Sequence, residues 1–249
     1  MSLDACARLV AEGDPDRFAA TLAAPPQARA RLLPLYAFNL ELARAPWAST
    51  EPLIAEMRLQ WWRDALDGPR PAHEVAGPLH DLIRHAGLPV DVLDRMAAAR
   101  RWDIWREPFD DRAAFDAYLD DTAGSLMALA AQATGAPPEA AAPARALGQA
   151  SGLAAFLRAV PDLIARGRHP LLDDSPQALS ALAQDGLARL DQARRARRLM
   201  GPAALAAWQT APLLRLAATE PARIAQGQLT LSEFTRRGRL LWAATTGRW

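Results

Sequence analysis

The length of 249 residues suits one large domain or two small ones, and a hydrophobic share of 51% provides a sizeable core. The 29 basic residues, all arginine, nearly balance 28 acidic ones, so the formal net charge is only +1. That balance argues against a dedicated nucleic-acid-binding protein, which would carry a strong basic excess. The single cysteine, Cys6, excludes an intrachain disulfide framework and a cysteine-cluster metal site.

Abundant alanine and leucine, with few valines and isoleucines, favour helices over strands, so the sequence predicts an all-α fold. No apolar stretch reaches the roughly 18 residues of a membrane-spanning helix. The first 18 residues lack the pattern of a signal or transit peptide. We therefore expect a cytoplasmic protein that is soluble or only peripherally attached to a membrane.

Prolines and glycines divide the chain into predicted helices. Asp14 and Pro15 resemble an N-cap followed by proline at the first helical position. Pro34 lies inside the second helical pattern, where it either kinks the helix or begins it, and we favour the kink. Short connectors and the absence of a linker or repeat predict one domain over residues 1–249, a single helical bundle. The expected helices are 15–22, 27–44, 52–66, 77–86, 90–105, 112–134, 138–165, 176–200, 202–218 and 232–244.

The triplet Tyr36-Ala37-Phe38 is followed, after further helical residues, by a Trp-Trp-Arg-Asp-Ala-Leu block at 61–66. This arrangement resembles the squalene/phytoene synthase family, whose members condense two prenyl diphosphates. In that family a first aspartate-rich motif follows the triplet and holds magnesium, but this chain has Ala43 and Arg44 there. Glu41 lies about 160° and 60° away from Ala43 and Arg44 around the helix. Its carboxylate would have to point in a different direction to replace a magnesium-binding aspartate at either position.

Further segments extend the resemblance over roughly residues 27–172. Residues 118–127, which begin at Tyr118 and include Gly124, resemble the family's segment of small residues that lets a substrate or a neighbouring helix approach closely. Residues 147–158 resemble the helix that carries the second aspartate motif, and residues 166–168 resemble its exit. The resemblance implies the trans-isoprenyl diphosphate synthase, or terpenoid synthase, type of bundle.

At the second aspartate motif the aligned positions hold Ala159 and Leu163, and of the residues between them only Asp162 is acidic. Pro161 is expected to disturb this helix further. Magnesium requires several oxygen ligands, which carboxylates and waters supply. We therefore predict no metal site and no catalytic residue, with Mg²⁺ as a cofactor only if rewired ligands keep the chain active. The scattered histidines have no paired-ligand spacing.

Other charged residues leave two interpretations open. Asp116 and Asp120 have DxxxD spacing, but acids at a helix start are also favoured by the macrodipole, which is our preferred explanation. Asp103 lies between two tryptophans, and we expect its carboxylate either to form a salt bridge or to line the cavity, without preferring one role over the other. Arg158, with Asp162 and Arg166, forms a ladder typical of a solvated helix face. The alternative is that Arg158 and Arg168 attract a phosphate or an anionic lipid head group.

Tryptophans mark two further regions. Trp61 and Trp62 project about 100° apart, so we expect one to pack with Leu53, Met57 and Leu66 and the other to line the cavity or an interface. Trp242 and Trp249 flank an arginine-rich segment at 235–249. We favour a terminal helix that closes the bundle, and the alternative is a segment that lies on an anionic membrane.

The phrase EMRLQWWRDALDG at 56–68 is similar to a divergent branch of the family, the phytoene-synthase-like assembly factors of respiratory complex I and their bacterial relatives. The resemblance implies a bacterial, non-catalytic assembly or lipid-binding factor that is peripheral on the inner membrane. Its possible partners are an isoprenoid or lipid ligand and respiratory-complex subunits, without nucleic acid. The alternatives are an active prenyl-diphosphate transferase and a scaffold for a protein partner. Candidate cavity or ligand residues are Tyr36, Phe38, Glu41, Trp62, Asp103, Tyr118, Gly124, Gln149, Arg158 and Arg168.

Overall fold

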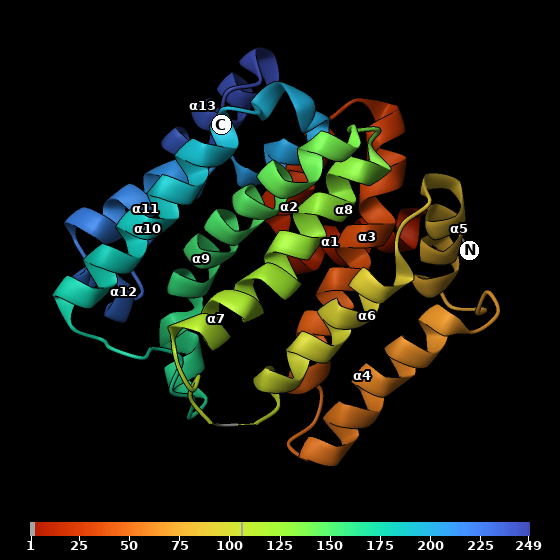
Figure 1. Ribbon diagram of the computed structural model, residues 1–249, viewed down its shortest axis with the longest axis horizontal. Coiled ribbons are helices and arrows are strands. Elements are labelled where there is room, and N and C mark those ends of the chain that lie inside the picture. Colours follow the sequence, from red (N-terminus) through yellow and green to blue (C-terminus); the bar gives the residue numbers. More distant parts are fainter. Residues whose placement is uncertain (1–2, 106) are drawn as a thin grey trace.

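Helices account for the regular structure of the computed structural model, which describes residues 3–105 and 107–249 and has no strand in these ranges. The predicted all-α fold is therefore confirmed. Figure 1 shows α9 crossing the middle of the molecule, with α10 and α11 on one side and α7 and α8 on the other. The α-helices are α1 (Leu3–Gly13), α2 (Pro15–Ala23), α3 (Pro26–Arg44), α4 (Pro52–Asp67), α5 (Ala76–Ala86), α6 (Val90–Ala99), α7 (Arg112–Leu119), α8 (Ser125–Ala133), α9 (Ala141–Ala165), α10 (Pro176–Arg194), α11 (Thr210–Thr219), α12 (Ala222–Ala225) and α13 (Glu233–Thr246).

The start of α2 follows the predicted capping chemistry. The Asp14 carboxylate accepts a hydrogen bond from the backbone N–H of Arg17 at 3.0 Å, and Pro15 occupies the first helical position. Helix α1, which precedes it, was not among the expected helices. It packs against α3 and buries Cys6 and Val10, so tertiary packing stabilises a short segment that the sequence pattern alone did not reveal.

Two prolines lie inside long helices without ending them. Helix α3 begins at Pro26 and continues through the buried Pro34, so the helix does not start at that proline. Helix α9 likewise continues through Pro161, and the expected disturbance of this helix does not interrupt it. Proline removes one backbone hydrogen bond in each helix, and both helices nevertheless bury many of their residues in the bundle.

Several predicted helices change form before their expected ends. Helix α6 gives way to a 3₁₀ turn at Arg100–Asp103, and a π-helical turn at Asp120–Gly124 separates α7 from α8. Helix α10 ends at Arg194, and a 3₁₀ segment at Gly201–Ala207 precedes α11. The π-helical turn packs against α9, a tertiary contact that composition and periodicity do not encode.

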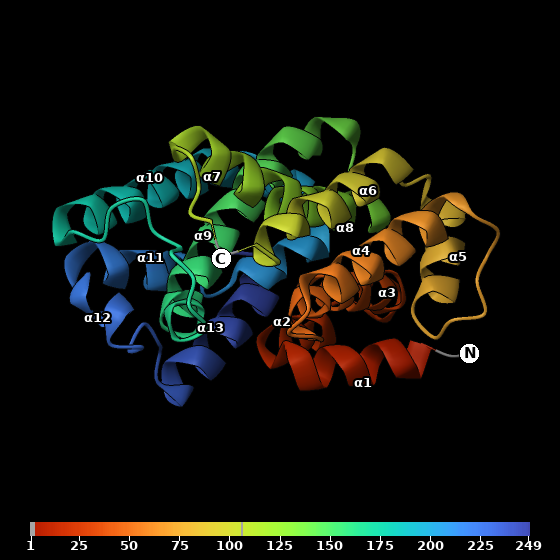
Figure 2. The ribbon, with the colours of Figure 1, turned by 90° about the horizontal axis from the view of Figure 1, so that it is seen from below.

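One cluster of buried hydrophobic residues extends from α1 to α13. Figure 2 shows α1, α2 and α13 along one edge of the bundle, and α13 packs against α2. Within the described ranges, the helices are all too short or too polar to span a bilayer.

Candidate functional site

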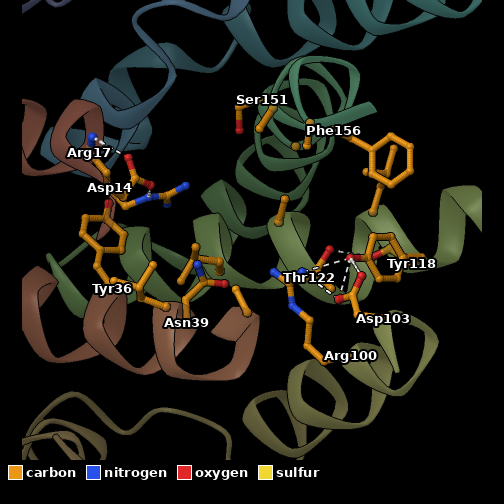
Figure 3. Close-up of a pocket in the computed structure, with 18 of the residues that line it drawn as sticks. Asp14, Arg17, Tyr36, Asn39, Arg100, Asp103, Tyr118, Thr122, Ser151 and Phe156 are labelled. Carbon is orange, nitrogen blue, oxygen red and sulfur yellow. Dashed lines mark hydrogen bonds and ion pairs between the residues drawn. The ribbon is translucent and has the colours of Figure 1, made fainter. Parts of the chain in front are cut away.

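A cavity of about 320 Å³ opens between α2, α3, the α7–α8 region and α9 (Figure 3). This volume lies at the lower end of the range typical of small-molecule sites. Its lining combines apolar side chains with polar ones, and the charged polar groups lie on opposite walls. The apolar residues include Leu40, Ala43, Leu119, Ala123, Leu126, Met127, Ala155, Phe156, Ala159 and Leu163, and the polar ones include Asp14, Arg17, Tyr36, Asn39, Arg100, Asp103, Tyr118, Thr122 and Ser151.

One wall combines an ion pair with a tyrosine. Arg17 Nε donates to Asp14 Oδ2 at 2.8 Å, and the Arg17 guanidinium lies 4.9 Å from the ring centroid of Tyr36. Burial raises the pKa of Tyr36 to about 12, so its phenol is protonated at neutral pH. The N-cap of α2 thus also contributes a neutralised charge pair to the cavity.

The opposite wall holds a similar trio. The Tyr118 hydroxyl donates to the Asp103 carboxylate, with oxygen–oxygen distances of 3.0 and 3.1 Å. Arg100 donates to the Tyr118 oxygen at 2.9 Å and to Asp103 Oδ2 at 3.2 Å. Burial raises the pKa of Tyr118 above its usual range, and Arg100 opposes that shift. Asp103 satisfies both predictions made for it, since it forms a salt bridge and lines the cavity.

The aligned magnesium-motif positions lie at this cavity, except for one. Ala43, Ala159 and Leu163 line it, whereas Arg44 lines a different pocket. The carboxylates that line the cavity come from Asp14 and Asp103, which lie on opposite walls and are each paired with an arginine. Across residues 3–105 and 107–249, no three or more His, Cys, Asp or Glu side chains are grouped closely enough to hold a metal ion. The residues present therefore do not fit the family's magnesium site.

The predicted arginines lie outside the cavity lining. Arg168 is buried, with its guanidinium 4.9 Å from the Trp102 ring centroid and 5.6 Å from that of Trp47, and it donates to the Trp102 carbonyl oxygen at 2.5 Å. Arg158, Asp162 and Arg166 are exposed, as expected for a solvated helix face, although the ion-pair partner of Arg158 is Asp16, at 3.4 Å, rather than Asp162. Both cations are thus engaged with the protein itself.

Three predicted cavity residues on α3 and α4 lie elsewhere. Phe38 and Trp62 are buried and pack edge to face, with ring centroids 5.3 Å apart. Trp62 and Glu41 line a separate pocket of about 290 Å³. Of the residues expected to pack with one of the two tryptophans, Leu66 is buried, whereas Leu53 and Met57 are exposed.

Gly124 and Gln149 do not line the cavity but lie next to it, where the π-helical turn contacts α9. Gly124 belongs to the π-helical turn, and α9 approaches it closely, in line with its predicted packing role. Gln149 Nε2 donates to Asp120 Oδ1 at 2.7 Å, and Arg145 also pairs with Asp120. Asp116 pairs with Arg112 and Arg189. Both DxxxD acids are therefore paired with arginines, and neither lies in the first turn of α7, where the macrodipole explanation would place them.

Sequence reasoning did not single out Arg17, Asn39, Thr122 or Ser151, all of which line the cavity. Arg17 follows the N-cap aspartate by three residues, a spacing that places the two side chains together. The others are polar residues among apolar helical neighbours, and this pattern is a weak indication that a residue lines a cavity.

Comparisons with known proteins identify the chain's relatives. The family model described as squalene/phytoene synthase matches residues 10–235. The chain is 30% identical over 198 residues to the Drosophila melanogaster protein named NADH dehydrogenase (ubiquinone) complex I, assembly factor 6 homolog, covering 74% of this chain and 58% of the relative. It is 26% identical over 161 residues to the Homo sapiens assembly factor 6, covering 63% and 48%. The chain thus spans about half the length of these curated relatives.

Solved structures support the fold. The crystal structure of a dehydrosqualene synthase in complex with ligand matches with a TM-score of 0.82 and 15% identity, covering 98% of this chain and 95% of that one. The squalene synthase HpnC from Alicyclobacillus acidocaldarius matches with a TM-score of 0.58 and 22% identity, covering 98% and 94%. At these identities the likeness shows the terpenoid synthase type of fold, as the sequence resemblance implied.

Proposed function

This chain belongs to the squalene/phytoene synthase family, and from that premise we propose that it is a non-catalytic, membrane-associated member that binds a lipid-like ligand or supports assembly of a respiratory complex. In this proposal the chain does not condense prenyl diphosphates. The cavity of the family fold persists with a different lining.

The observation that carries this proposal is the apolar lining where a magnesium–diphosphate site would need acids. Ala43, Ala159 and Leu163 offer no oxygen ligand. Asp14 and Asp103 are already neutralised by Arg17 and Arg100, respectively. Recruiting either carboxylate to a metal would leave a largely buried arginine without its partner, at a cost of several kcal/mol.

The same lining supports an apolar ligand. Leucine, methionine, alanine and phenylalanine side chains cover much of the cavity, and the charged groups on its walls are hydrogen-bonded within their own wall. Such a site favours an isoprenoid or acyl chain, because apolar surface is buried without displacing a hydrated charge. The names of the curated relatives support the assembly role, with respiratory-complex subunits as the partners.

The first experiment tests for the family's reaction. Purified protein is incubated with farnesyl or geranylgeranyl diphosphate and Mg²⁺, and the products are analysed by mass spectrometry. We expect the diphosphates to be recovered unchanged. A condensed C30 or C40 product would overturn the proposal in favour of an active transferase with rewired ligands.

The second experiment tests ligand binding at the cavity. Farnesol serves as an uncharged isoprenoid probe, and its binding is followed by calorimetry. We expect Ala159→Phe, which fills the cavity, to weaken binding at least about tenfold, whereas Ala165→Phe at the exposed end of α9 leaves it unchanged. Equal binding by both variants would contradict a ligand role for the cavity. In that case, enrichment of respiratory-complex subunits in a pull-down would favour assembly, and capture of other proteins would favour a general scaffold.

A further inference from the structure

The outer side of α13 carries large apolar side chains that the bundle does not cover. Phe234, Leu241 and Trp242 are 89%, 67% and 55% exposed. They lie at positions i, i+7 and i+8 of one helix, so they form a single stripe, with Gly238 between them. A helix that only closes a bundle turns such residues toward the core. We call this stripe the α13 face.

Polar contacts attach the inner side of α13 to the bundle. Arg236 forms an ion pair with Asp16 of α2, and Arg239 Nε donates to the Trp208 carbonyl oxygen at 3.3 Å. Ala243 is the buried residue of the helix. The α13 face is therefore not needed to hold the helix in place, and its apolar side chains are available to another surface.

Arginines surround the α13 face. Arg237 belongs to the same helix, and its side chain is 86% exposed. A hollow of about 270 Å³ beside Trp242 is lined by Arg194, Arg197, Arg239 and Arg248, and an adjoining hollow of about 830 Å³ adds Arg29 and Arg198. No described residue that lines either hollow is acidic. Acidic residues occur at the edges of the α13 face and of the hollows. Glu233 pairs with Arg236 and Arg237, and Asp191 pairs with Arg194.

Arg239, which lines the smaller hollow, is partly buried and lies near other arginines. Burial, followed by the nearby charges of Arg215 and Arg194, lowers the pKa of Arg239. A phosphate-bearing surface placed over these hollows would relieve that repulsion through charge-assisted hydrogen bonds.

We propose that the α13 face docks on an anionic membrane, with Phe234, Leu241 and Trp242 entering the head-group region and the surrounding arginines contacting lipid phosphates. This inference deepens the proposed membrane association by naming the surface that makes it. Apolar and aromatic residues beside hollows lined by arginines and by no acidic residue match a layer of phosphates over hydrocarbon. A protein partner would have to supply an equally acidic rim around an apolar patch.

The test is vesicle co-flotation of the whole protein. Vesicles of phosphatidylcholine alone are compared with vesicles that also contain phosphatidylglycerol, at low and high salt. We expect binding to the anionic vesicles that weakens as salt screens the arginines. The triple variant Phe234→Ser, Leu241→Ser and Trp242→Ser should lower the partition coefficient about tenfold or more.

The matched control lies on α4, whose residues Leu53, Met57 and Trp61 are 70%, 63% and 43% exposed. Their triple substitution to serine removes a similar apolar area from another helix and should leave vesicle binding unchanged. A second variant, Arg237→Glu with Arg248→Glu, should abolish the preference for anionic lipid while the circular dichroism spectrum remains native.

The outcomes separate this inference from the proposed function. The proposal for the α13 face is overturned if the α13 variant floats as well as the unchanged protein, or if the α4 variant loses binding equally. In either case the protein would associate with the membrane through another surface. If the unchanged protein ignores both kinds of vesicle, the docking proposal and the membrane association fail together. The prenyl diphosphate experiment would still decide catalysis separately.

Discussion

At the scale of single residues, the charges that line the cavity are neutralised in pairs. Asp14 with Arg17 and Asp103 with Arg100 each combine with a tyrosine, on opposite walls. Each acid therefore has a structural role that can be measured without knowing the ligand. The cost of removing one partner of a buried pair is large, because it leaves the other charge unpaired.

Asp103→Ala tests this role. We expect a loss of about 3 kcal/mol or more in the free energy of unfolding, because Arg100 and the Tyr118 hydroxyl lose their buried acceptor. Asp103→Asn keeps an acceptor oxygen and should lose less. Asp162→Ala on the exposed side of α9 is the control, with an expected change within about 0.5 kcal/mol. Urea denaturation measures all three, and equal losses for Asp103→Ala and Asp162→Ala would show that the trio is not structural.

Asp81 provides a prediction about pH. Hydrogen bonds from Arg70, at 2.9 and 3.0 Å, and then from Arg84 lower the pKa of Asp81 to about 2. Since its unfolded pKa is near 3.9, the unfolded chain binds more protons between these values, and stability falls as pH drops through this window. Because the pair is partly exposed, we expect only about 0.5–1 kcal/mol. Unfolding midpoints of the unchanged protein and Asp81→Asn should differ at pH 5 and converge toward pH 2, and a gap independent of pH would contradict the assignment.

At the scale of helices, α9 and the π-helical turn Asp120–Gly124 form a close contact that shapes the cavity. A Cβ at Gly148 would overlap the Ala123 carbonyl oxygen, and one at Gly152 would overlap the Ala123 side chain. Ala123 and Gly152 also line the cavity. The width of the cavity on this side is therefore set by glycine, because any larger residue would push the two elements apart.

Two glycine-to-alanine substitutions should change the stability of the protein in opposite directions. Gly148→Ala should lower stability by about 1–3 kcal/mol, because the added methyl group meets backbone atoms that cannot move aside. Gly238→Ala in α13 has no heavy atom within 4 Å of the added Cβ and should gain up to about 1 kcal/mol from helix propensity. Thermal denaturation compares them, and a stabilising Gly148→Ala would mean that α9 does not approach the turn this closely.

Helix positions could be predicted from the sequence better than helix forms. The cap at Asp14 and the prolines at the first positions of α2, α4 and α10 mark helix starts through local chemistry. The π-helical turn could not be predicted, because it depends on α9 packing against it, and α9 is distant in the sequence. The cavity residues divide in the same way. Tyr36, Asp103 and Tyr118 were predicted, whereas Phe38 and Trp62 lie in the adjacent core because helix rotation is set by tertiary packing.

At the scale of the whole molecule, the described residues share one hydrophobic cluster that includes parts of both ends of the chain. We therefore propose that the chain folds as one domain. Calorimetry should show a single transition with equal calorimetric and van't Hoff enthalpies, and far-ultraviolet and tryptophan signals should change together in urea. Two resolved transitions would contradict a single cooperative unit and point to a boundary between helices.

Asp16 joins three helices that are far apart in the sequence. Its carboxylate receives Arg236 from α13 and Arg158 from α9, and it lies two residues after Asp14 at the start of α2. The ion pairs of this one carboxylate therefore hold α9 and α13 against the short segment whose neighbours Asp14 and Arg17 form one cavity wall.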